Sequence, residues 1–143
     1  MALTNTHAEQ IAALLNDRNQ LTRKYTEEKV LTHADDYLVR VSDTGQVIAC
    51  VEVKSVQWYQ CEILHLTVAA AYANKGHGKA LLCEAERSAR TKGARILQCT
   101  IRAGNEESRS LFEWFGFVQV SNFYNQSSGN NIIVLQKVLA SAR

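Results

Sequence analysis

The chain has 143 residues, with 16 basic and 14 acidic side chains and a formal net charge of +2. This length suits one domain, and 46% hydrophobic with 21% charged residues excludes an intrinsically disordered chain. No apolar run approaches the ~18 residues of a membrane span, and residues 1–6 lack the features of a signal peptide. Without a basic tract, we expect no nucleic acid and no membrane as partner. We therefore expect one cytoplasmic domain over residues 1–143.

The cysteines and histidines indicate neither a disulfide framework nor a metal site. The cysteines form no C-x-x-C pair and each lies in an apolar segment, which favours buried reduced thiols: Cys50, Cys61, Cys83 and Cys99. The histidines lack metal-ligand spacing, so we expect no metal: His7, His33, His65 and His77.

Hydrophobic periodicity predicts helices first and strands next in the amino-terminal half. Apolar residues at helical spacing predict helices over residues 6–17 and 21–31. From residue 36 the period changes to that of strands. Strands are predicted over residues 37–41, 47–53 and 62–68, with a turn at 43–46 and a reversal near Trp58 and Tyr59.

The carboxyl-terminal half alternates helices with strands. A loop over residues 69–75 leads to a helix that begins near Gly76 and stops at Gly93. A strand over 95–101, a helix from Asn105 to Gly116 and strands over 117–124 and 132–138 follow. The order ααβββαβαββ predicts one mixed α/β domain.

The segment that enters the helix at Gly76 has the pattern of a phosphate-binding site. Gly76 and Gly78 open the helix directly after a buried strand and loop, and Lys75 and Lys79 add positive charge. Free amides at a helix N-terminus attract anions, and glycine lets a phosphate approach the backbone. The alternative is that the glycines only shape a turn.

Two nucleotide-binding motifs are excluded by residue identity. A P-loop needs glycine where Ala73 stands and Ser or Thr where Ala80 stands. A dinucleotide-binding fingerprint that begins at Gly76 needs a third glycine where Leu81 stands. The expected phosphate ligand is therefore of another kind.

Two motifs around this segment resemble the GNAT superfamily, the acyl-CoA-dependent N-acyltransferases. In its motif A, the last apolar residue of a strand stands eight positions before the first glycine of Q/R-x-x-G-x-G/A, as Val68 and Gly76 do. The stretch from Asn105 to Phe117 is similar to the signature N-x-x-A-x-x-L-Y-x-x-x-G-F. The chain departs from the pattern at Ala73, where Gln or Arg is usual, and at Phe112, where many members have Tyr.

The resemblance implies both a fold and a way to bind acetyl-CoA. The implied fold is mixed α+β, with a mostly antiparallel twisted sheet of about six or seven strands, a V-shaped split at the fourth strand and about four flanking helices. Main-chain groups of Leu66, Thr67 and Val68 would pair with the pantetheine arm. Amides from Lys75 to Lys79 would hold the pyrophosphate at the helix N-terminus. The whole cofactor-binding segment there would comprise Ala73, Asn74, Lys75, Gly76, His77, Gly78 and Lys79. Asn105, Arg109 and Phe112 would border the cofactor on the other side.

Glu62 is the expected general base. It stands six residues before Val68, as a Glu does in the histone-acetylating branch of the family. Apolar neighbours on a central strand should raise the pKa of its carboxyl by desolvation. The alternative is a structural Glu paired with Lys or Arg.

Other polar and aromatic candidates are less well placed by the pattern. Phe112 cannot protonate a thiolate, so Tyr124 or a water is the expected acid. His65 has the opposite strand parity to Glu62 and is expected to be structural unless a bulge intervenes. Trp58 and Tyr59 are candidates for the wall of an acceptor site, with core packing as the alternative.

We expect an N-acetyltransferase that moves an acetyl group from acetyl-CoA to a primary amine by direct attack in a ternary complex. The alternative is a weakly active or inactive acyl-CoA-binding sensor with the same fold. The sequence leaves the amine open, whether small molecule or protein, and also leaves open a monomer or a homodimer.

Overall fold

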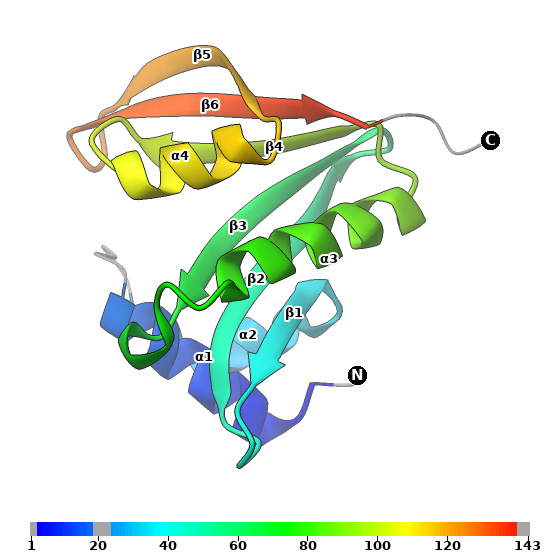
Figure 1. The fold of residues 1–143 in the computed structure, drawn as a ribbon, viewed down its shortest axis with the longest axis vertical. Coiled ribbons are helices and arrows are strands. Elements are labelled where there is room, and N and C mark those ends of the chain that lie inside the picture. Colours follow the sequence, from blue (N-terminus) through cyan, green and yellow to red (C-terminus); the bar gives the residue numbers. More distant parts are fainter. Residues whose placement is uncertain (1–2, 19–23, 140–143) are drawn as a thin grey trace. The chain divides into compact units, whose positions relative to one another are not determined.

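The computed structural model describes residues 3–18 and 24–139, which form four α-helices and six strands (Figure 1). The helices are α1 (Asn5–Arg18), α2 (Glu27–Thr32), α3 (His77–Thr91) and α4 (Glu106–Trp114). The strands are β1 (Tyr37–Val41), β2 (Val47–Gln57), β3 (Gln60–Val68), β4 (Ile96–Arg102), β5 (Val118–Asn125) and β6 (Asn130–Val138). The predicted order is confirmed. Residues 21–23 of the second predicted helix lie outside the described residues.

The six strands hydrogen-bond in the order β1-β2-β3-β4-β6-β5. The sheet is mostly antiparallel, with one parallel pair between β3 and β4. This parallel register covers three residue pairs, from Gln60 opposite Ile96 to Glu62 opposite Gln98. The mixed α+β fold with a split at this strand pair agrees with the prediction.

The chain divides into two compact units. The first comprises Met1–Val53 and His65–Ala85, and the second comprises Lys54–Leu64 and Glu86–Arg143. The prediction of a single domain over residues 1–143 stays a prediction.

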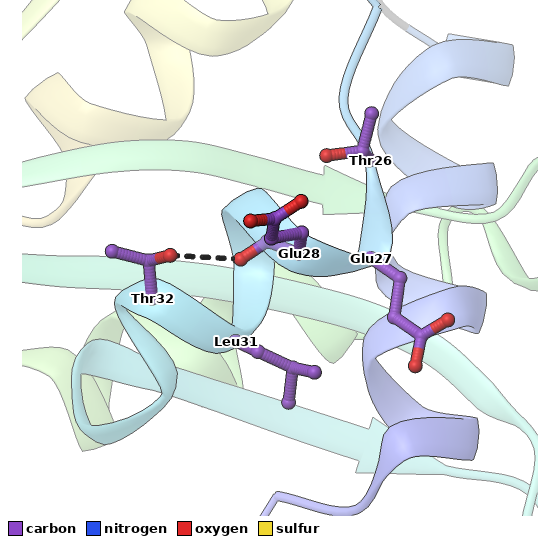
Figure 2. A pocket seen from close by; sticks show the side chains of 5 residues that line it. All are labelled: Thr26, Glu27, Glu28, Leu31 and Thr32. Atoms are coloured by element: carbon purple, nitrogen blue, oxygen red, sulfur yellow. Dashed lines mark hydrogen bonds between the residues drawn. The ribbon is translucent and has the colours of Figure 1, made fainter.

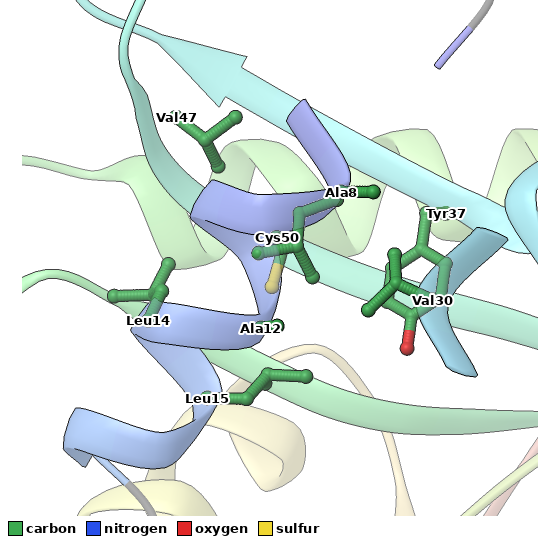
Figure 3. Close-up of a cluster of buried hydrophobic side chains, with 9 residues drawn as sticks. Ala8, Ala12, Leu14, Leu15, Val30, Tyr37, Val47 and Cys50 are labelled. Carbon is green, nitrogen blue, oxygen red and sulfur yellow. The ribbon is translucent and has the colours of Figure 1, made fainter. Parts of the chain in front are cut away.

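The core of the first unit forms between α1, α2 and the first two strands (Figure 3). In α1 the residues Ala8, Ile11 and Leu15 recur at helical spacing and are fully buried. They pack in one cluster with Val30 of α2 and Tyr37 of β1. This apolar stripe explains why a segment without an acidic first turn still folds as a helix.

The core of the second unit lies on one face of β4 and β6. Leu97, Cys99, Ile133 and Leu135 are at most 5% exposed, and Cys99 stands directly opposite Leu135. Because side chains alternate along a strand, Gln98 and its partner Gln136 point to the opposite face. This alternation places a polar pair beside the end of the parallel register.

Two local predictions need correction or extension. The prediction that all cysteines are buried is wrong for Cys83, which is exposed on α3, while Cys50, Cys61 and Cys99 are buried and free. The apolar stripe of α3 includes Leu82, and the next residue along a helix turns away from that stripe. The strand predicted to end at residue 53 continues to Gln57, and the chain reverses at residues 58–59 as expected. No helix among the described residues has the length and apolarity to cross a membrane.

Candidate active site

Glu62 lies on β3 in the second unit, with its two carboxylate oxygens in different surroundings. Gln98 Nε2 donates to Glu62 Oε1 at 3.4 Å, while Oε2 is buried without a hydrogen-bond partner. Burial raises the pKa of Glu62, and the hydrogen bond from Gln98 lowers it in part. Its hydrogen-bond partner is thus a neutral amide rather than the Lys or Arg of the structural alternative. A carboxyl with a raised pKa and an unpaired oxygen is suited to accept a proton near neutral pH.

Cys99 is the nearby titratable group that senses this carboxylate. Burial, and then the charge of Glu62, raise the pKa of Cys99 to about 12. Its thiol therefore stays protonated near neutral pH, which is unfavourable for a nucleophile.

The strand register separates Tyr124 from Glu62. Tyr124 pairs with Asn131 on β6, whereas the polar pair beside Glu62 ends at Gln136, five residues further along. Five residues span about 17 Å, and an odd number of steps reverses the face of the sheet. The register therefore gives no support to Tyr124 as an acid acting beside Glu62. Phe123, paired with Ile132, lies on the face of Gln136 instead.

The start of α4 uses Asn105 as its N-cap. Its side chain accepts a hydrogen bond of 3.2 Å from the amide of Ser108, as the sequence predicted. Arg109 is partly exposed and donates to Glu113 at 2.6 Å and to Gln119 at 3.2 Å. These contacts engage the polar atoms of two residues that the family resemblance places beside the cofactor. That placement stays a prediction.

Phe112 is part of the hydrophobic core. Its side chain is 4% exposed and packs edge to face against Phe117 with ring centroids 5.1 Å apart. Little of this ring is left to contact a ligand, so its predicted place beside the cofactor stays a prediction.

The predicted phosphate site lies in the first unit, where the loop after β3 enters α3. A short 3-10 turn at Ala70–Tyr72, absent from the prediction, begins this loop. Asn74 and Gly76 then adopt left-handed backbone conformations, with φ of 60° and 86°. The amide of Ala80 donates to the carbonyl of Gly76 at 3.0 Å. The amides of His77 and Gly78 belong to the first turn of the helix, ahead of this hydrogen bond.

The side chains around this loop are held by mutual contacts. Arg40 Nε donates to His77 Nδ1 at 3.2 Å, and Arg40 Nη1 lies 3.7 Å from Glu84 Oε1. The ammonium group of Lys75 lies 5.7 Å from the centroid of the Tyr72 ring. The arrangement keeps positive charge beside the helix start, while recognition of an anion would rest on backbone amides.

The end of β3 presents main-chain groups that already have partners. Arg18 Nε donates to the carbonyl oxygen of Val68 at 3.1 Å, and Thr67 Oγ1 donates to the carbonyl of His65 at 3.1 Å. Local sequence patterns do not indicate the Arg18 contact, because 50 residues separate the two positions. A carbonyl oxygen has two lone pairs, so the Val68 carbonyl can accept a second hydrogen bond. The predicted pairing of Leu66, Thr67 and Val68 with pantetheine stays a prediction.

His65 interrupts β3 with a left-handed backbone, φ 56°. Strand parity therefore does not fix the direction of its ring. The Tyr25 hydroxyl shares a hydrogen bond with His65 Nε2, which also lies 4.0 Å from Glu52 Oε1. Burial, and then the positive charge of Lys29, lower the pKa of His65. These contacts agree with the predicted structural role.

Three side chains that could ligate a metal ion lie close together, and the sequence did not predict this group. Ligand atoms of His33, Asp36 and Glu52 all lie within 4.8 Å of one another. They come from a helix end, a 3-10 turn and a strand, so no local spacing could indicate them. Glu52 is only 4% exposed. The expectation of no metal stays a prediction.

An open hollow lies on α2, as Figure 2 shows. Its lining comprises Thr26, Glu27, Glu28, Leu31 and Thr32. The two carboxylates point in different directions, and Thr32 Oγ1 donates to the carbonyl of Glu28 at 2.9 Å. No predicted catalytic or cofactor-binding residue lines this hollow.

Solved structures share this fold over nearly the whole chain. Ard1 from Thermoplasma volcanium matches with a TM-score of 0.86 and 18% identity, covering 99% of this chain and 97% of that one. The ribosomal-protein-S18-alanine N-acetyltransferase from Escherichia coli matches with 0.77 and 19%, covering 100% and 94%. A GNAT family acetyltransferase from Elizabethkingia anophelis with acetyl-CoA bound matches with 0.74 and 17%, covering 89% of each chain.

These identities are low, so the likenesses establish the fold alone. No curated protein matches the chain. The model of the Acetyltransferase (GNAT) family matches residues 4–117, which include both motifs and Glu62. The chain belongs to the GNAT acetyltransferase family.

Proposed function

We propose that this protein transfers an acetyl group from acetyl-CoA to a primary amine, with Glu62 as the general base. The observation that carries the proposal is the half-buried carboxyl of Glu62, whose Oε2 has no hydrogen-bond partner and whose pKa is raised by burial. Family membership supports acetyl transfer in general. A structural neighbour with acetyl-CoA bound and another named as an N-acetyltransferase support this donor and an amine acceptor.

The proposed reaction needs a neutral amine and a place for its proton. The amine nitrogen attacks the thioester carbonyl, a C–N bond forms and the C–S bond breaks, and the nitrogen loses a proton to Glu62. The thiolate leaves as coenzyme A after protonation, for which water is the simplest donor because Phe112 carries no proton. A base with a pKa closer to neutrality stays ionised at working pH and still drives this transfer.

Binding of acetyl-CoA would rest on the backbone of the loop and helix start. The amides of His77 and Gly78 come before Ala80, whose amide donates to the Gly76 carbonyl, and they lie at the positive end of the helix. Backbone recognition tolerates side-chain change, so we expect Ala73 to weaken binding without abolishing it. The acceptor stays at the level of a small-molecule or protein amine.

A second candidate is an acyl-CoA sensor without turnover. Two observations favour it: Ala73 lacks a polar side chain for the phosphate, and Phe112 is buried and cannot donate a proton. Both candidates predict cofactor binding, and only the enzyme predicts release of free thiol in the presence of an amine.

The test combines calorimetry with a thiol-release assay. Acetyl-CoA and coenzyme A are titrated into the protein, and a panel of amines is then assayed with the wild-type chain, Glu62→Gln and the matched surface change Glu9→Gln. We expect micromolar binding by all three and turnover lost only in Glu62→Gln. Binding without turnover for any amine would support the sensor, and no binding at all would exclude both candidates.

A further inference from the structure

We infer that Gln98 and Gln136 are positioning residues for Glu62, forming a directed chain of hydrogen bonds across three neighbouring strands. The inference rests on the proposed function, because it describes how the proposed base is held. It concerns residues that neither GNAT motif of this chain includes.

The strand register places the three side chains in one row. Glu62 stands opposite Gln98 in the parallel pair of β3 and β4, and Gln98 stands opposite Gln136 in the antiparallel pair of β4 and β6. Residues paired in this way share a face of the sheet. Gln136 Nε2 donates to Gln98 Oε1 at 2.6 Å, and Gln98 Nε2 donates to Glu62 Oε1 at 3.4 Å.

The carboxylate determines the direction of the chain. An ionised carboxylate only accepts hydrogen bonds, so Gln98 must turn its amide nitrogen toward Glu62. Its carbonyl oxygen then faces Gln136, which must donate. A flip of the Gln98 amide would break both hydrogen bonds and bring its oxygen against the carboxylate. Gln136 therefore keeps Gln98 in the one orientation that supports an ionised Glu62.

The same arrangement engages only one of the two carboxylate oxygens of Glu62. Oε1 is engaged by Gln98, and Oε2 is buried with no partner. A carboxylate held through one oxygen cannot rotate freely, and a fixed carboxylate favours transfer of a proton from a bound amine. Gln98 thus orients the carboxylate of Glu62. Its hydrogen bond also lowers the pKa of Glu62, against the rise that burial causes.

The pKa of Glu62 is the quantity that the test follows. The two resolved influences on its pKa are burial and Gln98. The titratable group that senses its charge, Cys99, has a pKa raised to about 12 and stays neutral across the assay range. The acidic limb of a pH–rate profile would therefore report this carboxyl.

The experiment measures kcat/KM for thiol release against pH in Gln98→Met, Gln136→Met and the double variant. Gln126→Met, the same change in the exposed turn before β6, is the control. We expect Gln98→Met to move the acidic limb up by about one pH unit, a tenfold loss on the acidic side, because the hydrogen bond that lowers the pKa is gone. Gln136→Met should shift it less in the same direction, and adding it to Gln98→Met should change nothing further. The KM for acetyl-CoA should not change.

A merely structural role would lower activity equally at all pH values and leave the limb in place, and this result would overturn the inference. Carbon-13 NMR of the Glu62 carboxyl gives a second readout that needs no turnover. The Glu62 pKa should rise in Gln98→Met, and the side-chain amide signals of Gln98 in the wild type should titrate with it. If Gln98→Met fails to fold, the wild-type amide signals of Gln98 and the pH profile of Gln136→Met still test the positioning role. Full activity of Glu62→Gln would reject the proposed base, whereas an unmoved Glu62 pKa in Gln98→Met rejects the positioning role alone.

Discussion

Lys137 Nζ lies 2.6 Å from Oε1 of Glu86, which links the last strand to α3 within the second unit. The same ammonium group lies 4.2 Å from the centroid of the Phe115 ring at the end of α4. Burial opposes ionisation of Glu86, but Lys137 and Arg90 outweigh it and lower the pKa of Glu86. One lysine thus joins three elements of the unit.

Lys137→Met should destabilise the protein in a pH-dependent way. Methionine retains an apolar stem for packing against Phe115 but cannot pair with Glu86. A carboxyl whose folded pKa lies below its unfolded value stabilises the fold above the unfolded value, and this gain is lost as the pH falls. Because the pair is partly exposed, we expect a loss of about 1 kcal/mol in the free energy of unfolding at pH 7.

Urea unfolding at pH 7 and at a pH well below the ordinary glutamate pKa of about 4.3 checks this expectation, with Lys54→Met on exposed strand surface as the control. The difference between wild type and Lys137→Met should shrink at the lower pH. An equal difference at both pH values would mean that Lys137 acts through packing rather than charge.

The sequence alone predicted the elements that local periodicity and capping determine. Asn105 caps α4 because its short polar side chain reaches an amide three residues on, a relation visible in the sequence. The row of Glu62, Gln98 and Gln136 was not predicted, because 36 and 38 residues separate its members. Only the strand register brings them together, and register is a tertiary property.

Tyr124 shows the same dependence on strand register. Its place on β5 was predicted, but a face of the sheet is assigned only after pairing with β6 is known, and the bulge between Gln119 and Ser121 shifts that pairing by one residue. In the same way, no periodicity indicates that His65 has a positive φ.

Tyr124→Phe should therefore leave turnover by the proposed enzyme unchanged. The hydroxyl belongs to a residue paired with Asn131, on the face of the sheet opposite to Gln136. Thiol release measured at several pH values checks this, with Glu62→Gln as the inactive reference. A tenfold or larger loss of kcat, the least that general acid catalysis would supply, would restore Tyr124 as the acid.

Gly76→Ala should separate stability from cofactor binding. Gly76 and Gly45 have φ of 86° and 84°, and an added Cβ would meet nothing within 4 Å at either position. The strain of a left-handed alanine should thus cost both variants about 1 kcal/mol of stability. Only Gly76 lies at the start of the proposed phosphate site, so only Gly76→Ala should weaken acetyl-CoA binding. We expect a loss of affinity of about tenfold or more, because hydrogen bonds from backbone amides to the phosphate would be lost.

Calorimetry and urea unfolding on both variants make the comparison. Gly45 lies in the turn between β1 and β2, which makes Gly45→Ala a matched control. Equal affinity in the two variants would mean that the start of α3 does not hold the cofactor.

His65 should make the protein less stable as the solution is acidified. Burial and Lys29 lower its pKa in the folded state, so the unfolded chain binds the proton more readily. Stability is then lost as the pH falls through the ordinary histidine value of about 6.5. Glu52, 4.0 Å from Nε2, opposes this trend without reversing it.

His65→Asn should flatten the dependence, because asparagine does not titrate and tolerates a positive φ. Between pH 7.5 and 5.5 we expect the wild type to lose about 1 kcal/mol more than His65→Asn. His7→Asn, in the first turn of α1, serves as the control. Parallel curves for wild type and His65→Asn would place the acid sensitivity elsewhere.

Glu62→Gln should stabilise the fold while it removes turnover. Burial raises the folded pKa of Glu62 above its unfolded value, so the ionised carboxylate disfavours folding at neutral pH. The glutamine oxygen can still accept from Gln98, and the charge is gone. We expect a gain of up to about 1 kcal/mol at pH 8 that vanishes below about pH 4, together with a loss of about two to four orders of magnitude in kcat. Unfolding curves at both pH values, with Glu9→Gln beside them, test the gain. A variant that is less stable at pH 8 would show that the carboxylate is a structural group. A buried carboxylate that serves catalysis destabilises the fold, so removal of its charge should make the fold more stable.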